Sequence, residues 1–309
     1  MVVTHGALPP RRQRHALTIG TFDGVHRGHE AILDRVAAEA AALGVPSCVL
    51  TFEPHPREFF SPALAPARLT RLREKLEWFA QAGIARTHVA RFDAKLAAFS
   101  PERFLEEMVV QGLQAAWLLV GKDFRFGARR AGDFALLGRA ADRHGFALEA
   151  MPDVTQGGER VSSSGIRAAL EAGDLEGAAA LLGRRYTMSG RVAHGEGLGR
   201  KLGYPTANLP LRRRPPLSGI FVVEAELEET EQRLRGAASV GTRPTIREHA
   251  RPLLEVHLLD FEGDLYGRHL RVTFLERLRG EQKFDGLEAL RAAIAADVAR
   301  TREYFARHG

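Results

Sequence analysis

The sequence predicts an α/β chain in two parts: a parallel sheet covered by helices, and then an antiparallel β-barrel followed by a long terminal helix. Short apolar runs alternate with helical stretches up to residue 184, as they do where helices cover both faces of a sheet. From residue 185 onward, segments that alternate apolar and polar residues follow one another across glycine-rich or charged turns. With 309 residues and about 150 per domain, we expect two domains, at 1–184 and 185–309.

The composition is that of a globular protein and excludes several other classes. Hydrophobic residues make up 45% and charged residues 27%, which excludes disorder as the main state. No run approaches the roughly 18 apolar residues of a membrane-spanning helix, and the first residues lack the apolar core of a secretory signal. The single cysteine, Cys48, cannot form an internal disulfide. We therefore expect a cytoplasmic protein with no membrane partner.

The net charge of +6 is small and is spread along the chain. A nucleic-acid-binding protein usually gathers its positive charge on one face or tail, so we expect no nucleic-acid partner. A mildly basic surface also suits phosphorylated small molecules. We therefore expect small-molecule substrates.

Strands and helices alternate in the first part. Ser100 and Pro101 open one of the helices, with the serine as N-cap and the proline in the first turn. Parallel sheets bind ligands beyond the carboxyl ends of their strands, so functional loops are expected there. The expected strands span 17–19, 45–52, 88–92, 116–120 and 147–151, and the expected helices span 26–43, 69–82, a stretch from 100 onward, and 136–144.

The second part is rich in strand candidates. Several of them alternate apolar and polar residues, as half-buried antiparallel strands do. A barrel or sandwich closed by a helix is the natural interpretation. The expected strands span 186–194, 221–227, 234–240, 253–259 and 270–275, and the final helix spans 287–308.

A glycine-rich turn joins the first strand to the first helix, with the sequence Gly-Thr-Phe-Asp-Gly-Val-His-Arg-Gly-His over residues 20–29. Its glycines allow a ligand to approach the backbone, and the helix N-terminus offers unpaired N–H groups to phosphate. His26 and His29 lie on one face of the first helical turn and can donate to phosphate oxygens. A metal site is the weaker alternative, because no third ligand is near in the sequence. The H-x-G-H pattern resembles the signature of the nucleotidyltransferase superfamily.

Three more loops are expected at the same edge of the sheet. They have the sequences Thr-Phe-Glu-Pro-His-Pro (51–56), Val-Gly-Lys-Asp-Phe-Arg-Phe-Gly (120–127) and Val-Ser-Ser-Ser-Gly-Ile-Arg (161–167). The rings of Phe124 and Phe126 can stack on a flat ligand, and Arg167 can hold a phosphate with two hydrogen bonds. We expect these loops to converge with the glycine-rich turn on one site.

The densest motif covers residues 190–208, with the sequence Gly-Arg-Val-Ala-His-Gly-Glu-Gly-Leu-Gly-Arg-Lys-Leu-Gly-Tyr-Pro-Thr-Ala-Asn. Its spacing fits neither a Walker A sequence nor a dinucleotide fingerprint. Backbone N–H groups of its glycines can wrap phosphates, with basic side chains beside them. The residues expected to contact phosphates here are Gly195, Gly199, Arg200 and Lys201. The hydroxyl of Thr206 and the amide oxygen of Asn208 are hard ligands that suit Mg²⁺.

Three further strings stand out in the second part, at 240–245, 254–261 and 279–284. The second string contains Glu255, which from the residues alone is an ordinary half-exposed strand glutamate. His257 lies on the same strand face by its period of two, and we assign it no role. The third string either lies near a ligand or simply starts the last helix.

With these motifs in order, the whole chain resembles the bacterial bifunctional riboflavin kinase/FMN adenylyltransferases, also called FAD synthetases. The resemblance implies a Rossmann-like nucleotidyltransferase domain that adenylylates FMN to FAD, and a kinase domain that makes FMN from riboflavin. ATP, riboflavin, FMN and FAD are then substrates or products, and Mg²⁺ is the expected cofactor of both steps.

The resemblance also implies roles for particular residues. His26 and His29 would stabilise charge on the ATP phosphates, and Glu255 would be the base beside the riboflavin 5′-hydroxyl. Ser163, Ser164 and Arg167 correspond to a Ser-Ser-Thr-x-Ile-Arg loop of the family, with Ser164 in place of the usual threonine. ATP is expected to contact the first turn at Gly20, Phe22, Asp23 and Gly24. The flavin is expected to contact Phe52, His55, Pro56, Asp123, Phe124 and Phe126.

Other function classes stay open at this point. One is a flavin-binding or regulatory protein that has lost one or both activities. Another is an adenylyltransferase for a different phosphorylated acceptor, because the H-x-G-H pattern specifies nucleotide chemistry better than the acceptor. The sequence favours a monomer without deciding the oligomeric state. It does not say whether FMN passes directly between the two sites.

Overall fold

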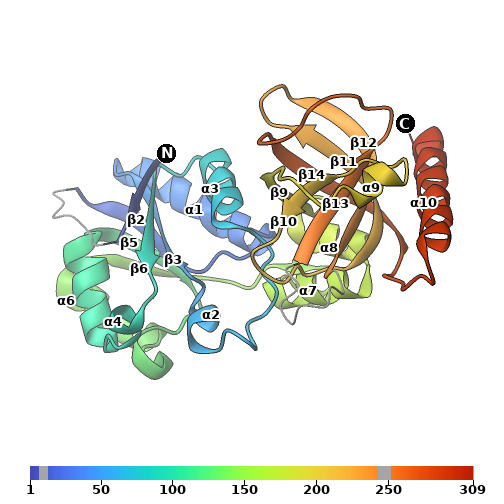
Figure 1. The fold of residues 1–309 in the computed structure, drawn as a ribbon. Helices are drawn as coiled ribbons and strands as arrows, with labels where there is room; N and C mark the ends of the chain where they lie inside the picture. Colours follow the sequence, from blue (N-terminus) through green and yellow to red (C-terminus); the bar gives the residue numbers. More distant parts are fainter. Residues whose placement is uncertain (7–12, 243–251, 309) are drawn as a thin grey trace. The chain divides into compact units, whose positions relative to one another are not determined.

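A fully parallel sheet forms the first part of the chain in the computed structural model, which describes residues 1–6, 13–242 and 252–308 (Figure 1). Its six strands lie in the order β1-β4-β3-β2-β5-β6. The strands are β1 (Val2–His5), β2 (His15–Ile19), β3 (Ser47–Glu53), β4 (Arg86–Arg91), β5 (Ala115–Gly121) and β6 (Ala147–Met151). The five predicted strands are present, and β1 adds an edge strand that the sequence did not predict, because four partly exposed residues are too few to show a pattern.

Helices cover both faces of this sheet. Neighbouring residues of a strand point to opposite faces, so Val49 packs with residues of α1 and α3, whereas Leu50 packs with residues of η1 and α6. The helices are α1 (Arg27–Leu43), α2 (Pro56–Phe60), α3 (Leu72–Gln81), α4 (Ala94–Ala97), α5 (Pro101–Phe104), the π-helix η1 (Leu105–Gly112), the 3₁₀ turn η2 (Ala128–Arg130) and α6 (Phe134–His144). Ser100 caps α5 by accepting a hydrogen bond from the N–H of Arg103 at 3.1 Å, as predicted.

An antiparallel barrel forms in the second part, with strand order β10-β13-β12-β11-β14-β9. Its two edge strands approach each other through a bridge between Ala193 and Asn208, so the barrel is nearly closed. Apolar side chains such as Phe221, Val256 and Phe274 fill its interior. The strands are β9 (Thr187–Arg191), β10 (Ala207–Pro210), β11 (Gly219–Leu227), β12 (Gln232–Thr242), β13 (Pro252–Leu258) and β14 (His269–Arg279). The sequence predicted all of these except the short β10.

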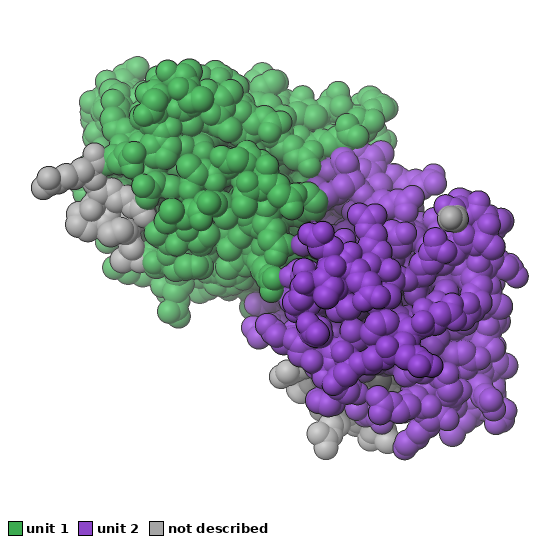
Figure 2. All heavy atoms as spheres, turned by 90° about the horizontal axis from the view of Figure 1, so that it is seen from above, with its two compact units in different colours: residues 1–66, 70–162 green, residues 67–69, 163–309 purple. Residues whose placement is uncertain are grey.

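Contacts divide the chain into two compact units, residues 1–66 with 70–162 and residues 67–69 with 163–309 (Figure 2). Two helices that precede the barrel, α7 (Ser163–Ala172) and α8 (Leu175–Leu182), belong to the second unit, because their apolar residues pack in the barrel's core cluster. The compact units therefore change at Ser162/Ser163, whereas the sequence pattern changes at 184/185. A functional boundary at 184/185 stays a prediction.

The terminal helix α10 (Leu287–His308) has the predicted bounds and covers part of the barrel's outer face. Tyr304 and Phe305 pack there with Val222, and Arg279 on β14 forms an ion pair of 2.7 Å with Asp297. Leu287, at the start of the helix, is 59% exposed, so the helix uses its later turns for packing. Within the described ranges, no helix is both long and apolar enough to cross a membrane.

Two candidate active sites

The turn that leaves the carboxyl end of β2 places two imidazoles at the start of α1. The rings of His26 and His29 stack, with centroids 3.7 Å apart and planes 17° apart. His26 occupies the N-cap position and is 6% exposed, and the ring of Phe22 lies 5.0 Å from that of His29. Both imidazoles therefore lie where a helix N-terminus favours phosphate, which is the placement that the motif predicted.

The side chains of the same turn point into the protein. Phe22 is 2% exposed and packs edge-on against Phe79 at 5.3 Å. The buried carboxylate of Asp23 accepts a hydrogen bond from the N–H of Thr70 at 3.1 Å. Gly24 adopts a φ of +93°, a conformation that favours glycine. An ATP contact by this turn is therefore expected from its backbone, and the side chains of Phe22 and Asp23 serve to hold the backbone in place.

The loop after β3 contains His55 and Pro56, two of the predicted flavin contacts. The ring Nδ1 of His55 accepts a hydrogen bond from the N–H of Arg57 at 3.1 Å, and Glu58 accepts one from the N–H of His55 at 3.3 Å. These two bonds form a capping box on α2, with Pro56 as its first residue. These bonds thus fix the backbone of the loop at the carboxyl end of β3.

Sequence reasoning missed an aromatic cluster beside this loop. The ring of Phe92 packs edge-on against those of Phe59 and Phe60 at 5.6 and 5.7 Å and against that of Phe52, a predicted flavin contact, at 6.0 Å. Phe60 is 64% exposed, although an aromatic side chain of this size gains by burial. The adjacent phenylalanines two residues after the Pro-His-Pro string were the available signal. The cluster presents apolar ring surface that a flat ligand can cover.

The loop after β5 holds the other predicted flavin contacts. The rings of Phe124 and Phe126 stack on each other, 5.6 Å apart and 18° between planes. Phe126 lies in the core against Phe104, and a Cβ on Gly132 would overlap its ring at 2.6 Å. Phe124 is half-buried. Phe124 is therefore the member of the pair that a ligand can reach, and Phe126 supports it from the core.

A short hairpin of β7 (Thr155–Gln156) and β8 (Glu159–Arg160) also joins this edge of the sheet. Arg160 bridges two carboxylates, Asp123 at 2.9 Å and Asp153 at 3.0 Å. The hydrogen bond from Arg160 lowers the pKa of Asp123. Val154, just before the hairpin, faces Gly28 in the first turn of α1. The hairpin thus lies between the histidine turn and the loop of Phe124.

Ser163, Ser164 and Arg167 lie at the start of α7 and belong to the second compact unit. Ser163 is half-buried and Ser164 is exposed. Arg167 donates from Nε to the carbonyl of Ala67 at 2.6 Å, which is a contact within the second unit. The convergence of these residues with His26 and His29 stays a prediction.

The second candidate site is a row of polar side chains on the barrel's outer face. Asn208 on β10 pairs in register with Glu255 on β13, which pairs in turn with Ser239 on β12. Residues that pair across strands share a face, and the flanking Leu209 and Leu254 point into the core. Asn208 is 7% exposed, and its Oδ1 is buried without a hydrogen-bond donor among the described residues. An amide oxygen held in this way is an acceptor ready for a ligand.

The motif at 190–208 folds over the end of this row. A Cβ on Gly195 would lie 2.6 Å from Nδ2 of Asn208, so a side chain there would displace the Asn208 amide. The short helix α9 (Leu198–Lys201) carries Gly199 against Thr206, with Arg200 and Lys201 exposed. These contacts bring the predicted phosphate-binding residues and the predicted Mg²⁺ ligands together.

Two aromatic contacts anchor this segment to the barrel. The ring of His194 stacks on that of Tyr266 at 3.8 Å. His257, to which the sequence assigned no role, has its ring Nδ1 2.9 Å from the carbonyl of Pro205 and packs edge-on against Tyr204 at 5.5 Å. His257 therefore holds the chain just before Thr206.

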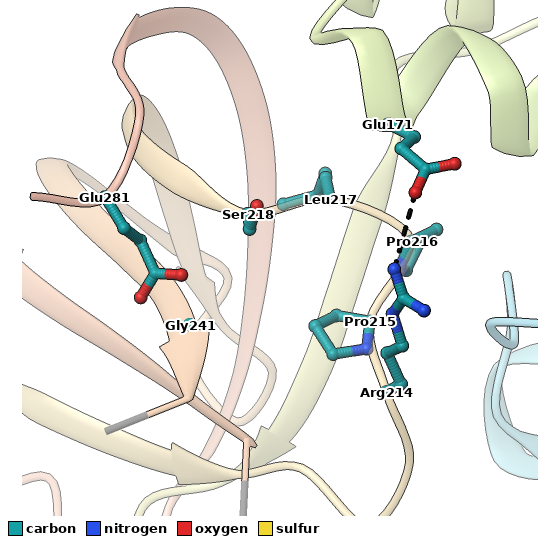
Figure 3. A pocket seen from close by; sticks show the side chains of 8 residues that line it. All are labelled: Glu171, Arg214, Pro215, Pro216, Leu217, Ser218, Gly241 and Glu281. Carbon is teal, nitrogen blue, oxygen red and sulfur yellow. Dashed lines mark hydrogen bonds and ion pairs between the residues drawn. The ribbon is translucent and has the colours of Figure 1, made fainter. Parts of the chain in front are cut away.

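A cavity of about 220 Å³ opens on the same outer face (Figure 3). Gly241, two residues along β12 from Ser239, forms one wall, with the carboxylate of Glu281 packed directly on it. Burial raises the pKa of Glu281. The cavity is lined by Glu171, Arg214, Pro215, Pro216, Leu217, Ser218, Gly241 and Glu281. The string at 279–284 thus lines a cavity and ends before α10 begins, while Arg243, Pro244 and Thr245 of the string at 240–245 lie outside the described residues.

Neither site contains a metal cluster of the usual side chains. Over the described ranges, no group of three or more His, Cys, Asp or Glu side chains could hold a metal ion. The candidate ligands in the second unit are instead a hydroxyl and an amide oxygen, at Thr206 and Asn208. Oxygen donors of this kind suit Mg²⁺, which commonly completes its coordination with water and substrate phosphates.

Two family models match the chain in succession. The model described as FAD synthetase matches residues 8–165, and the model described as riboflavin kinase matches residues 182–305. Both candidate sites fall within these matches, apart from Arg167 and Glu171, which lie between the two matched ranges.

Curated relatives match almost the whole chain. A bifunctional riboflavin kinase/FMN adenylyltransferase from Escherichia coli K12 is 47% identical over 94% of this chain and 92% of its own length. A protein of the same name from Pseudomonas fluorescens is 48% identical over 96% of this chain and 94% of its own length. Among solved structures, that of a macrolide-efflux protein from Streptococcus pneumoniae is similar with a TM-score of 0.80 and 27% identity, over 98% of this chain and 99% of the other.

Proposed function

The chain belongs to the bifunctional riboflavin kinase/FMN adenylyltransferase family, and from that premise we propose how its residues carry out the two reactions. The protein phosphorylates riboflavin with ATP to give FMN and ADP, and it then adenylylates FMN with ATP to give FAD and pyrophosphate. One observation supports the assignment of sites. Each range that a family model matches contains one of the two groups of polar residues described above: the stacked histidines in the first range, and the Asn208–Glu255 row in the second.

In the adenylyl transfer, a phosphate oxygen of FMN attacks the α-phosphorus of ATP, and the bond from that phosphorus to the β-phosphate oxygen breaks. Pyrophosphate leaves, so the reaction needs no nucleophile from the protein. We assign the imidazoles of His26 and His29 and the N–H groups at the start of α1 to the charge that develops on the phosphate oxygens. Ser163, Ser164 and Arg167 are assigned to the same triphosphate by the likeness of their loop.

For the flavin of this first site, we propose the aromatic cluster and the loop of Phe124. Ring surface at Phe60 and Phe124 is accessible. Phe60 ends the short helix α2 that follows β3, and Phe124 lies on the loop that follows β5 of the same sheet. Stacking of the flavin on such a surface would bury apolar area that is otherwise exposed to water. Phe52, His55, Pro56, Asp123 and Phe126 then shape the site from behind.

In the kinase reaction, the riboflavin 5′-hydroxyl attacks the γ-phosphorus of ATP, and ADP leaves. We assign the proton of that hydroxyl to the carboxylate of Glu255, which lies beside Asn208 in the strand register. The backbone of Gly195 and Gly199, together with Arg200 and Lys201, is assigned to the ATP phosphates. The cavity at Gly241 and Glu281 is on the same face and offers the apolar walls of Pro215 and Leu217 to the flavin ring.

Mg²⁺ fits the residues of this second site. The buried Oδ1 of Asn208, which has no donor among the described residues, and the hydroxyl of Thr206 are hard oxygen ligands next to the segment that would hold the triphosphate. When bound, the ion supplies positive charge that neutralises the triphosphate. We propose these two residues as its protein ligands.

The test is to supply the two flavins separately, with ATP and Mg²⁺, and to resolve the products by chromatography. We expect His29→Ala to abolish FAD formation from FMN while FMN formation from riboflavin continues. Asn208→Ala is expected to do the reverse. Loss of both activities from a folded single variant would show that the two reactions share one site. A wild-type protein that binds flavin but forms neither product would support the flavin-binding alternative.

We also propose a cytoplasmic location, because both reactions consume ATP, and a monomer as the working state. Light scattering of the purified protein, with and without ATP and flavin, measures the mass directly. A mass of twice 34.0 kDa or more would overturn the monomer.

A further inference from the structure

We propose that Thr70 and Lys75, which no motif singled out, are positioning residues of the adenylyl-transfer site. They hold the turn at residues 21–25 in the conformation that receives the ATP phosphates. The inference rests on the proposed function of the first unit. It concerns residues that act through the backbone of the turn and need not touch ATP themselves.

The turn is strained and therefore needs support. Phe22 has a φ of +49° and Val25 a φ of +40°, both in the left-handed region. A non-glycine residue is uncommon there, and a β-branched residue such as valine is a true outlier. Such conformations are unfavourable and persist only where the surroundings over-determine them. Something outside the turn must supply that constraint.

Thr70 supplies part of it with both its backbone and its side chain. Its N–H donates to Oδ1 of Asp23 at 3.1 Å, and its hydroxyl oxygen accepts from the N–H of Gly24 at 3.0 Å. The hydroxyl can also donate to the same carboxylate oxygen, at 3.4 Å. Thr70 is 6% exposed, so water does not compete for these bonds. One residue thus fixes two consecutive residues of the turn.

Lys75 fixes a third residue from the adjacent helix α3. Its Nζ donates to the carbonyl of Thr21 at 2.5 Å, and the residue is 3% exposed. A lysine is almost never buried to this degree without a specific purpose, because its charge loses hydration. Here the buried charge lies beneath a turn that precedes His26, on the side of the sheet where a polyanion would bind. The ammonium therefore both orients the Thr21 carbonyl and adds positive potential to the turn.

The helix that carries Lys75 is itself fixed at its start. The carboxylate of Glu74 accepts a hydrogen bond from the N–H of Arg71 at 2.6 Å, and Glu74 is buried as well. This bond closes a capping box on the first turn of α3. Lys75 therefore projects from a rigid base, as a positioning residue must.

The experiment compares Thr70→Val with Thr70→Ser in the full-length protein, measuring steady-state FAD formation from FMN. Valine removes the hydroxyl and keeps the shape, whereas serine keeps the hydroxyl. We expect Thr70→Val to raise KM for ATP by about ten-fold or more, since small displacements of a binding turn cost up to about 100-fold. KM for FMN and the kinase reaction should stay near wild type, and Thr70→Ser should restore KM for ATP. Lys75→Met is expected to act in the same direction.

Arg73→Ala is the matched control, because Arg73 lies on the same helix but forms an exposed ion pair with Glu77 at 2.9 Å. It should leave KM for ATP unchanged. An unchanged KM for ATP in Thr70→Val overturns the proposal, as does a loss of FAD formation that no excess of ATP recovers, which would assign Thr70 a folding role. If the wild-type protein itself formed no FAD, the proposed function would fail instead, so the two failures are distinguishable.

Discussion

At the turn of the first unit, the side chains of Phe22 and Asp23 point into the protein, whereas on the barrel of the second unit Asn208 and Glu255 point outward from paired strands. Both pairs lie inside motifs that indicated nucleotide chemistry. In the first unit the motif shapes a backbone, and the groups that we propose to contact the ligand are N–H groups and two imidazoles. In the second unit the motif side chains are themselves the groups that we propose to contact the ligand. A motif residue can therefore matter through the chain path it enforces or through its own atoms, and substitution separates the two.

The largest effect is expected where a side chain acts directly. Glu255→Gln keeps the shape of the strand residue and removes the base. We expect kcat of the kinase reaction to fall by about 10²–10⁴-fold, the usual contribution of a general base, with little change in KM for riboflavin. The measurement is FMN formation from riboflavin, with FAD formation from supplied FMN as the internal control. A kinase rate within two-fold of wild type would remove Glu255 from the chemistry.

The next effect tests the opposite behaviour in the first unit. Phe126→Ala should lower the free energy of unfolding by about 3–5 kcal/mol, because Phe126 fills the core. Phe124→Ala should lower it by less than about 1 kcal/mol and should instead raise KM for FMN. Urea denaturation measures the first effect and initial rates measure the second. The interpretation fails if the two variants exchange these phenotypes.

Gly195 is a residue of the second unit that matters because it has no side chain, so it resembles the turn residues of the first unit in acting indirectly. A Cβ there would meet the amide of Asn208, so Gly195→Ala should displace that amide. We expect kcat/KM of the kinase for ATP to fall by about 10–100-fold with stability little changed. Leu198→Ala, an exposed position on the same segment, is the control. Equal rates for the two variants would show that the segment moves freely over Asn208.

The smallest effect concerns the exposed ion pair of Asp123 and Arg160. Arg160 lowers the folded pKa of Asp123 below its ordinary value of 3.8, so the pair stabilises the protein above that pH. This contribution is lost as the pH falls through the folded pKa. Because both side chains are more than half exposed, Asp123→Asn should cost at most about 1 kcal/mol at neutral pH. The difference from wild type should vanish well below pH 3.8, as measured by urea denaturation at several pH values.

Much of the fold followed from periodicity. The strand at 147–151 and the helix at 287–308 have the predicted bounds, because each shows a clear apolar pattern between strong turn residues. The edge strand β1 and the short β10 escaped prediction, since four residues carry too little pattern. The position of α7 and α8 in the second unit also escaped it, because sequence order says nothing about which core a helix joins.

The candidate sites were predictable in part for the same reason. The stacking of His26 and His29 follows from their spacing of three on a helix. The pairing of Asn208 with Glu255 could not be predicted, because strand register depends on contacts between distant segments. The sequence did not single out Thr70 or Lys75, because the burial of a lysine cannot be inferred from its residue type alone. Phe60 gave a signal that became meaningful only with its exposure known.

Residues 67–69 limit how the chain can be divided into its two compact units. Leu69 packs in the barrel's core cluster, and its carbonyl accepts a hydrogen bond from the hydroxyl of Tyr186 at 3.1 Å, yet the chain on both sides of it belongs to the other unit. No single cut can therefore return each unit whole. A fragment that begins at 163 leaves Tyr186 without that acceptor, and a fragment that begins at 185 also lacks the helices that fill the core. Dividing the chain between the two units therefore removes residues 67–69 from the core to which Leu69 contributes.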